Sequence, residues 1–482
     1  MNFYELFIPH ATLLLGVFII SALEIWGEED RLSHQWIVHT FVLLLATIQQ
    51  VLLYRVPSTV FGRGGLVLDG VSQTLSISIL LLGIVVQLWR RGEYTQLTPQ
   101  ANLLTLGATL FALFSVQSNR IFFGILAIIG LLWAIQGALA AEGHRKNQPA
   151  LVHSALVRSL IIFLVGGLLS LLCFSVFTET RIDEMQRVIA RPNLSVSGLM
   201  SIQILTLFLG ALVMGIPPFQ GLLGYSRRQT SWPLAVGATT LLAIVGLNIF
   251  LRWVILIFSR PNIGALELEA LGTINVFLDV RIVSVVGLVL VPLLALFNND
   301  LKSSFLVFIL NPFVHALFAF SFGQRETFGF AMSQILVSVF VMGLLISAIE
   351  SLQLPPQFSW KEWRGMGRKD LISSLLVIMS LVAAAGLSPF YGSILLYKTL
   401  CINSWFGLFL LLNVALSGYY VMRLTALAFQ KGATSATRVR ELTKNQRLWG
   451  LGQLALLIFM GIFWESLYKY GAFSIRNFFG DI

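Results

Sequence analysis

Long apolar runs separated by short polar segments recur along the whole chain. A helix that spans a membrane needs roughly 20 mostly apolar residues, and about fourteen runs approach that length. The pattern predicts membrane spans at 7–26, 35–54, 68–89, 101–119, 121–141, 155–177, 197–223, 232–257, 280–297, 303–323, 328–352, 371–400, 403–430 and 447–468. The expected fold class is therefore all-α and integral to a membrane, with about fourteen transmembrane helices.

The composition agrees with a multi-pass membrane protein. Of the 482 residues, 57% are hydrophobic and only 11% are charged, whereas a soluble chain carries about 25% charged residues. The basic residues that give the net charge of +10 fall mainly in predicted loops, so they indicate orientation and not nucleic-acid binding. Their distribution favours an orientation with both termini outside. This assignment puts Lys302 in an inner loop, and Arg252 and Arg281 in outer loops.

Two of the predicted spans contain residues that interrupt a helix. Span seven ends in A-L-V-M-G-I-P-P-F-Q-G, where Pro217 and Pro218 are adjacent. Span twelve contains G-L-S-P-F-Y-G, with Gly386, Pro389 and Gly392. Proline removes a backbone donor and crowds the preceding turn, and in lipid each freed backbone group must find a partner within the protein. We expect both helices to be broken at these residues.

The two broken spans are five apart in the series, and this offset predicts an internal repeat. Because the offset is odd, the second copy is upside down, so spans 4–8 and 9–13 form two inverted five-helix repeats. The predicted divisions are an N-terminal three-helix segment at 1–100, a first repeat at 101–257, a second at 280–430 and a C-terminal helix at 447–482. Paired interruptions in inverted repeats indicate an ion or substrate path at mid-membrane. The alternative is a pair of incidental proline kinks, which membrane helices tolerate.

Five short motifs, in order and at the right spacing, carry a family resemblance. They are L-V-L-D-G-V-S with Asp69 in span three, P-F at 218–219, F-L-R ending at Arg252, L-K-S-S-F-L-V with Lys302, and A-G-L-S-P-F-Y-G in span twelve. From about residue 66 to residue 430, the chain resembles the antiporter-like subunits of respiratory complex I. The most similar type is the one called subunit N in bacteria and ND two in mitochondria. The resemblance implies a membrane-arm subunit of a proton-translocating NADH:quinone oxidoreductase in a bacterial inner (cytoplasmic) membrane.

The chain departs from that family at the residues that carry protons. The resemblance puts Ile129 in place of a glutamate of span five, Gln220 in place of a histidine, and three aliphatic residues in place of lysines of spans seven, eight and twelve, namely Val213, Ala243 and Leu396. Aliphatic side chains cannot hold or release a proton. A charge at mid-membrane costs about 2.5–3.5 kcal/mol on insertion scales, so it persists only where something requires it. The resemblance therefore implies a subunit that keeps its shape for assembly, with a degenerate proton channel.

Two other ionisable residues are candidate relays. His315 lies in span ten, where the alternative role is a hydrogen bond to a neighbouring helix. Lys398 lies two positions after Leu396, about 200° around a helix, so it faces elsewhere and its alternative role is to reach toward the membrane surface.

The sequence contains no motif for self-contained chemistry. It has no phosphate-binding or dinucleotide-binding glycine loop and no HExxH motif, and its two cysteines, Cys173 and Cys401, both lie in apolar runs. We therefore expect no cofactor, no metal and no catalytic residue in this chain. The expected partners are other membrane-arm subunits of complex I, in a hetero-oligomer, and lipid. The alternatives are a stand-alone or Mrp-type cation/proton antiporter subunit and a scaffold subunit of another membrane complex.

Overall fold

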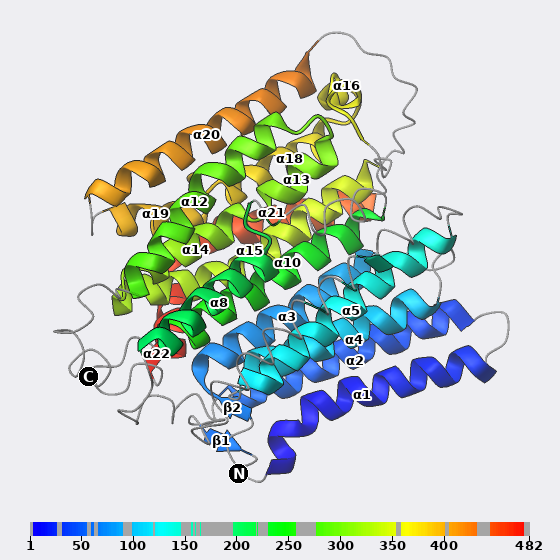
Figure 1. Ribbon diagram of the computed structural model, residues 1–482. Helices are drawn as coiled ribbons and strands as arrows, with labels where there is room; N and C mark the ends of the chain where they lie inside the picture. The colour runs from blue at the N-terminus through cyan, green and yellow to red at the C-terminus, as the bar shows by residue number, and fades with distance from the viewer. Residues whose placement is uncertain are drawn as a thin grey trace. The chain divides into compact units, whose positions relative to one another are not determined.

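The computed structural model describes most of the predicted spans as helices (Figure 1). The described residues are 3–26, 31–54, 59–61, 66–89, 99–118, 121–145, 156–157, 160, 164, 196–217, 219, 230–256, 276–352, 358–400, 404–430 and 444–476. The prediction of an all-α membrane fold is confirmed in its main feature. Predicted span six, at 155–177, lies almost entirely outside the described residues. Pro218 and Gln220 also lie outside them.

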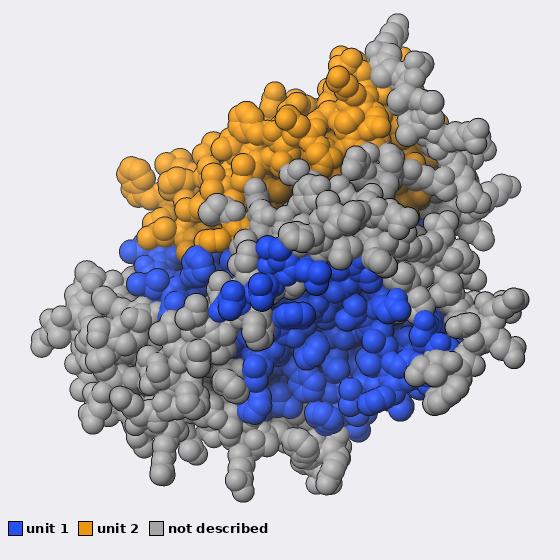
Figure 2. All heavy atoms as spheres, turned by 45° about the vertical axis from the view of Figure 1, so that its right-hand side comes forward, with its two compact units in different colours: residues 1–214, 241–280, 476–482 blue, residues 215–240, 281–475 orange. Residues whose placement is uncertain are grey.

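The chain divides into two compact units, coloured blue and orange in Figure 2. Unit 1 comprises residues 1–214, 241–280 and 476–482, and unit 2 comprises residues 215–240 and 281–475. The helices of unit 1 are α1 (Phe3–Trp26), α2 (Arg31–Leu53), α3 (Gly70–Trp89), α4 (Pro99–Gln117), α5 (Ile121–Arg145), α8 (Val196–Met214), the second half of α10 (Trp232–Asn248) and the π-helix η2 (Ile249–Leu256). The division into two units does not test the N-terminal three-helix segment and the two inverted repeats expected from the sequence, so these stay predictions.

Unit 2 contains the remaining helices. They are most of α12 (Val276–Phe297), then α13 (Leu301–Phe308), α14 (Asn311–Phe320), α15 (Arg325–Ser351), α16 (Trp360–Trp363), α17 (Met366–Lys369), α18 (Leu371–Ala384), α19 (Tyr391–Leu400), α20 (Ser404–Phe429), α21 (Lys444–Ile462) and nearly all of α22 (Trp464–Arg476). The long helix α15 packs against α14, α18, α19 and α21. Its residues are buried on nearly every side, as expected for a uniformly apolar helix in the middle of a bundle.

Unit 1 contains a short β-hairpin that the sequence did not predict. The strand β1 (Thr59–Phe61) pairs antiparallel with β2 (Leu66–Leu68), and Leu66 also forms a bridge to Ser118, just after α4. Leu68 is buried against Leu53 at the end of α2. Three-residue strands are too short to show an alternating pattern, so the connection between spans two and three gave no signal.

In the part of the chain that the structure describes, nine spans are long and apolar enough to cross a membrane. A tenth exists if α21 and α22 count together, although they are bent by 75° at Phe463. The expected single helix of span fourteen is therefore wrong, because an amphipathic segment follows the bend. Its Lys469 pairs with Glu465 at 3.3 Å on the exposed side. The total of fourteen stays a prediction.

Candidate functional site

The first predicted break lies at the end of α8. The helix stops at Met214, and Gly215 has a φ of +75°. This left-handed backbone conformation is open to glycine and costly for other residues. Pro217 follows within three residues and is buried. The helix therefore ends where the sequence predicts it.

The residues just before this break are packed among apolar neighbours. Val213 and Ala243 are fully buried, and Ile129 on α5 is half-buried. A Cβ added to Gly246 would lie 2.6 Å from the Cβ of Met214 and 2.7 Å from its backbone nitrogen. The backbones of α8 and α10 are therefore almost in contact one turn from Ala243. This packing leaves no space for a long side chain on that side of α10.

The second break separates α18 from α19 and has a regular helix cap. Gly386 has a φ of +71°, its N–H donates to Ala383 O, and the N–H of Leu387 donates to Val382 O, both at 3.1 Å. This pair of bonds is the Schellman arrangement, in which a left-handed glycine ends the helix. Gly392 in the first turn of α19 faces Gly386, since a Cβ on Gly392 would lie 2.9 Å from the Cα of Gly386. Pro389 lies in the connection between them.

A network of buried amides and a hydroxyl satisfies the backbone at the second break. Asn311 Nδ2 donates to the carbonyl of Ala384, the last residue of α18, at 3.2 Å, and also approaches Ser417 Oγ at 3.4 Å. Asn413 Nδ2 donates to Asn311 Oδ1 at 2.8 Å and to Leu288 O at 2.6 Å. The freed carbonyl of α18 thus has the internal partner that a helix end in lipid requires.

His315 joins this network from α14. Its Nε2 lies 2.7 Å from Asn413 Oδ1, an acceptor, so Nε2 carries the hydrogen and the ring is anchored to α20. Within the described residues, Nδ1 has no hydrogen-bond partner. The ring lies beside the break, with Cε1 3.4 Å from where a Cβ on Gly386 would be. The geometry matches the alternative role, a hydrogen bond to a neighbouring helix, and leaves one ring nitrogen that can accept a proton.

Leu396 and Lys398, the other two residues singled out in this region, have different surroundings in the structure. Leu396 is buried, and its Cδ1 lies 2.8 Å from where a Cβ on Gly386 would be, so it fills the space at the break with apolar atoms. Lys398 lies in the last turn of α19 and is only half-buried. Within the described residues, Lys398 takes no part in the hydrogen bonds of this network. Val213, Ala243 and Ile129 belong to unit 1, and Leu396 belongs to unit 2.

The sequence correctly marked Asp69 as the residue that opens α3, but its main partner was missed. Asp69 accepts the N–H of Ser72 at 2.7 Å, which caps the helix. Its two carboxylate oxygens lie 2.5 and 2.6 Å from Arg252 NH2, and both side chains are nearly fully buried. Arg252 is part of η2 and not of an outer loop, so that assignment is wrong.

Lys302 and Arg281 were also assigned to loops, and both assignments are wrong. Lys302 is fully buried in the first turn of α13, where its Nζ lies 5.0 Å from the Trp232 ring centre and donates to the carbonyl of Thr230. Arg281 lies in α12 and donates to Ser321 O at 2.9 Å. A lone Lys or Arg at the edge of an apolar run looks like a loop charge, because sequence cannot show the aromatic ring that will cover it.

Comparisons with known proteins give the fold of the chain. No protein-family model matches it, and no curated protein matches it. Among solved structures, a chain of respiratory complex I from Thermus thermophilus with bound aureothin has a TM-score of 0.74 and 17% identity, covering 96% of this chain and 99% of that one. A chain of the membrane-bound sulfane sulfur reductase, an archaeal respiratory membrane complex, has a TM-score of 0.79 and 15% identity, covering 98% and 97%. A chain of the Mrp complex from Dietzia sp. DQ12-45-1b has a TM-score of 0.77 and 12% identity, covering 98% and 97%.

The chain has the same fold as these chains of three membrane complexes. The similarity covers nearly the full length of both chains in each comparison, so it is not limited to one helical hairpin. Within the described residues, no group of three or more His, Cys, Asp and Glu side chains could hold a metal ion. The chemistry available at the second break is hydrogen bonding by amides and one imidazole.

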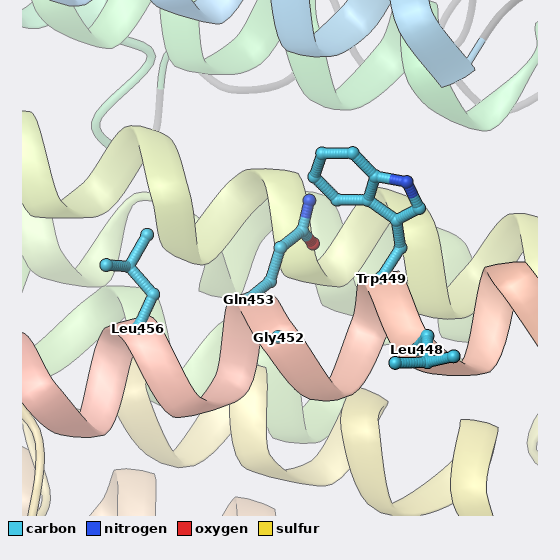
Figure 3. Close-up of a pocket in the computed structure, with 5 residues that line it drawn as sticks. All are labelled: Leu448, Trp449, Gly452, Gln453 and Leu456. Carbon is cyan, nitrogen blue, oxygen red and sulfur yellow. The ribbon is translucent and has the colours of Figure 1, made fainter.

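A separate pocket on α21 has a mostly apolar lining. It is lined by Leu448, Trp449, Gly452, Gln453 and Leu456, and Figure 3 shows Trp449 and Gln453 extending to the same side of the helix. The only polar side chain of this lining, Gln453, accepts a hydrogen bond from Ser347 at 3.2 Å. The pocket is therefore suited to apolar chains such as those of lipid.

Proposed function

We propose that the chain is a membrane-arm antiporter-like subunit of a proton-translocating NADH:quinone oxidoreductase, of the subunit N type. In this proposal it holds its place in the assembly and moves no proton through the family's carrier positions. The observation that carries the proposal is the full-length similarity to a chain of complex I, which covers 96% of this chain and 99% of that one. The five motifs of the sequence support the same assignment.

The packing around the first break supports the loss of proton transfer. A buried carrier needs a side chain that ionises and a partner or water that stabilises its charge. Val213 and Ala243 offer neither, and the near contact of Met214 with Gly246 closes the space between α8 and α10 on the side of Ala243. The side chains of the former carriers thus fill volume in the core without taking part in chemistry.

A second candidate is a scaffold subunit of another respiratory membrane complex. The observation that favours it is the TM-score of 0.79 to the sulfane sulfur reductase chain, against 0.74 for the complex I chain. An Mrp-type antiporter subunit is less consistent with the sequence, because such a subunit needs its carrier glutamate and lysine. The partner subunits decide between the first two candidates.

Gentle purification of the tagged chain from its native membranes tests the proposal. We expect it to copurify with the other membrane-arm subunits, and the preparation to reduce a quinone with NADH. Copurification with a different set of membrane subunits and no NADH oxidation would support the scaffold candidate. Isolation of the chain alone, monodisperse and active in cation/proton exchange, would contradict both.

A further inference from the structure

One side of α20 in unit 2 is apolar and exposed over most of its length. Trp405, Leu408, Leu412, Tyr419 and Met422 are between 43% and 80% exposed. Their spacing of three, four or seven positions puts them on one face of the helix. Because α20 is long and apolar enough to cross a membrane, this face is suited to contact with the acyl chains of lipid.

An exposed arginine lies at the end of this face. Arg423 comes 18 positions after Trp405, which is about five turns of an α-helix, so the two side chains project from the same side. The rise between them is about 27 Å, close to the roughly 30 Å of the hydrocarbon core of a bilayer. Tryptophan is enriched where a helix meets the membrane surface. If Trp405 lies at one surface, Arg423 lies at the level of the lipid phosphates on the other.

The guanidinium of Arg423 is held in place by its neighbours. Its NH1 donates to Leu296 O at 3.0 Å, and its Cζ lies 4.5 Å from the centre of the Trp360 ring. The bond to Leu296 uses one of the five N–H groups of the guanidinium. A fixed guanidinium loses less entropy when it binds an anion than a freely moving one does.

The segment 360–370, which contains α16 and α17, lies against this end of α20. Trp363 Nε1 donates to Leu424 O at 2.9 Å, and Arg368 Nε donates to Phe429 O at 3.0 Å. Both residues of the second bond come five positions after those of the first, so the segment follows the last turns of α20. Figure 1 shows α16 beside this end of the helix.

The segment adds positive charge around Arg423. Lys361, Arg364 and Arg368 are exposed, and Lys361 directly follows Trp360, the ring that covers Arg423. Among the described residues, none of these four basic side chains forms an ion pair. We call Lys361, Arg364, Arg368 and Arg423 the α20 basic patch.

The two acidic residues of the segment are already used as helix caps. Glu362 Oε2 accepts the N–H of Ser359 at 2.6 Å, and Asp370 Oδ1 accepts the N–H of Ser373 at 3.1 Å. Neither carboxylate is therefore well placed to pair with the ammonium group of a zwitterionic lipid. The charge of the patch favours a lipid with a net negative headgroup.

We propose that the α20 basic patch binds an anionic phospholipid. The phosphate accepts hydrogen bonds from Arg423, the other three basic residues attract its charge, and the acyl chains lie along the exposed face of α20 past Tyr419. Both parts of the lipid thus meet matching chemistry on one helix. The site does not depend on which complex the chain joins, so its failure would leave the proposed function unchanged.

A high-resolution cryo-electron microscopy map of the wild-type chain, in the assembly with which it copurifies, tests the site directly. We expect the phosphate density of a phospholipid within hydrogen-bond distance of the Arg423 guanidinium, continuing into acyl chains beside Tyr419. A side chain of a neighbouring subunit bound to Arg423 would overturn the proposal in favour of a protein partner. Water alone at Arg423 would overturn it as well.

Thermal stability in defined lipids gives a second readout. The fraction of the tagged chain that stays soluble is measured after the purified assembly is heated in mild detergent with phosphatidylglycerol or phosphatidylcholine of the same acyl chains. We expect phosphatidylglycerol to raise the midpoint by a few degrees more, because a ligand of the folded state stabilises it. Equal midpoints in the two lipids would contradict the proposal. An equal rise with inorganic phosphate alone would indicate a site for free anions and contradict it too.

Variants assign this lipid effect to the patch. R423Q should remove most of the difference between the two lipids, whereas the loss of its bond to Leu296 lowers both midpoints alike. If R423Q does not assemble, K361Q/R364Q keeps that bond and should still reduce the difference. The matched control is R325Q/K469Q, which removes two exposed charges outside the patch and should leave the difference unchanged. A difference that persists in both patch variants, or that falls equally in the control, would rule out the site.

Discussion

The two helix breaks share a backbone design and differ in what surrounds them. Each helix ends at a glycine with a φ of +75° or +71°, and a proline follows within three residues. The break after α8 adjoins tightly packed apolar residues, with Val213 and Ala243 nearby. The break between α18 and α19 has amides from α14 and α20 and the His315 ring. The backbone geometry of a broken membrane helix is therefore retained with or without polar side chains beside it.

The difference lies in what is next to the end of each broken helix. At the second break, the terminal carbonyl of Ala384 receives a side-chain donor from Asn311. At the first, the end of α8 lies so close to α10 that a Cβ on Gly246 would clash with Met214. A polar network tolerates added polar groups, whereas close backbone packing does not. This contrast leads to five expected outcomes.

The largest effect is expected when a lysine is placed at each break. V213K buries an ammonium among apolar side chains, and an unpaired buried charge costs about 3–5 kcal/mol. L396K places the same charge beside Gly386 and His315, where the network offers acceptors, so its cost is smaller. The amount of each variant in the assembled complex, measured on a native gel, checks this order.

A compensating substitution sharpens the same test. We expect I129E combined with V213K to be milder than the sum of the two single variants, because a carboxylate can pair with the ammonium. Additive losses would indicate that Ile129 and Val213 are too far apart to pair. Equal losses for V213K and L396K would contradict the contrast between the breaks.

Removing the side-chain cap of the second break should have the next largest effect. N311L leaves the carbonyl of Ala384 and a donor of Asn413 without their partner, and each such group costs about 1–3 kcal/mol. The thermal midpoint of the chain in detergent measures this loss. The control is T240V, because the Thr240 hydroxyl donates to Val236 O within its own helix, α10, at 2.9 Å. If T240V lowered the midpoint as much as N311L does, the loss in N311L could not be assigned to the missing cap of Ala384.

The two glycines should differ in their tolerance of alanine. A left-handed backbone costs a residue with a Cβ about 1–2 kcal/mol. In G215A this is the full cost, because no atom of the described residues lies within 4 Å of the new Cβ. In G386A the Cβ also meets Leu396 Cδ1 at 2.8 Å, so the midpoint should fall further. In the double variant G386A/L396A we expect this additional fall in the midpoint to disappear. If it remained, the loss in G386A would come from backbone strain alone.

The smallest effect is expected on proton transport. If the second break is structural, a chain carrying both H315Q and K398M should assemble and leave proton translocation by the complex unchanged. Translocation is measured as acidification per NADH oxidised in sealed vesicles. Loss of pumping with assembly intact would show that the proton path has been rerouted through these residues.

Local chemistry was predictable from the sequence, and long-range contacts were not. Gly215, Pro217 and Gly386 end helices because of their own backbone properties, so the breaks could be located from sequence alone. The partners Asn311 and Asn413 are 102 residues apart, and nothing local links them. The spacing of Asn413 and Ser417, four apart in an apolar span, is a signal that could have pointed to a polar face on α20.

The charged residues show the same limit. In the sequence, Lys302 resembles a charge in a loop. Its buried neighbour Trp232 lies 70 positions earlier, so the sequence around Lys302 gives no sign of this contact. The bend between α21 and α22 occurs at Phe463, two residues after Gly461, and a single glycine in an apolar run is too weak a signal to predict a bend. The fall in hydropathy around Glu465 and Lys469 was the available sign of an amphipathic helix.

The ion pair of Asp69 and Arg252 has a consequence for how the chain is made. The two residues are 183 positions apart, so α3 leaves the ribosome long before η2 does. During that interval the Asp69 carboxylate has its cap bond to Ser72, three residues away, but not its cation. Insertion of the first helices into the membrane therefore proceeds without the pair. The pair closes only after the middle of the chain has been translated, so it fastens the earliest-made helices late in biosynthesis.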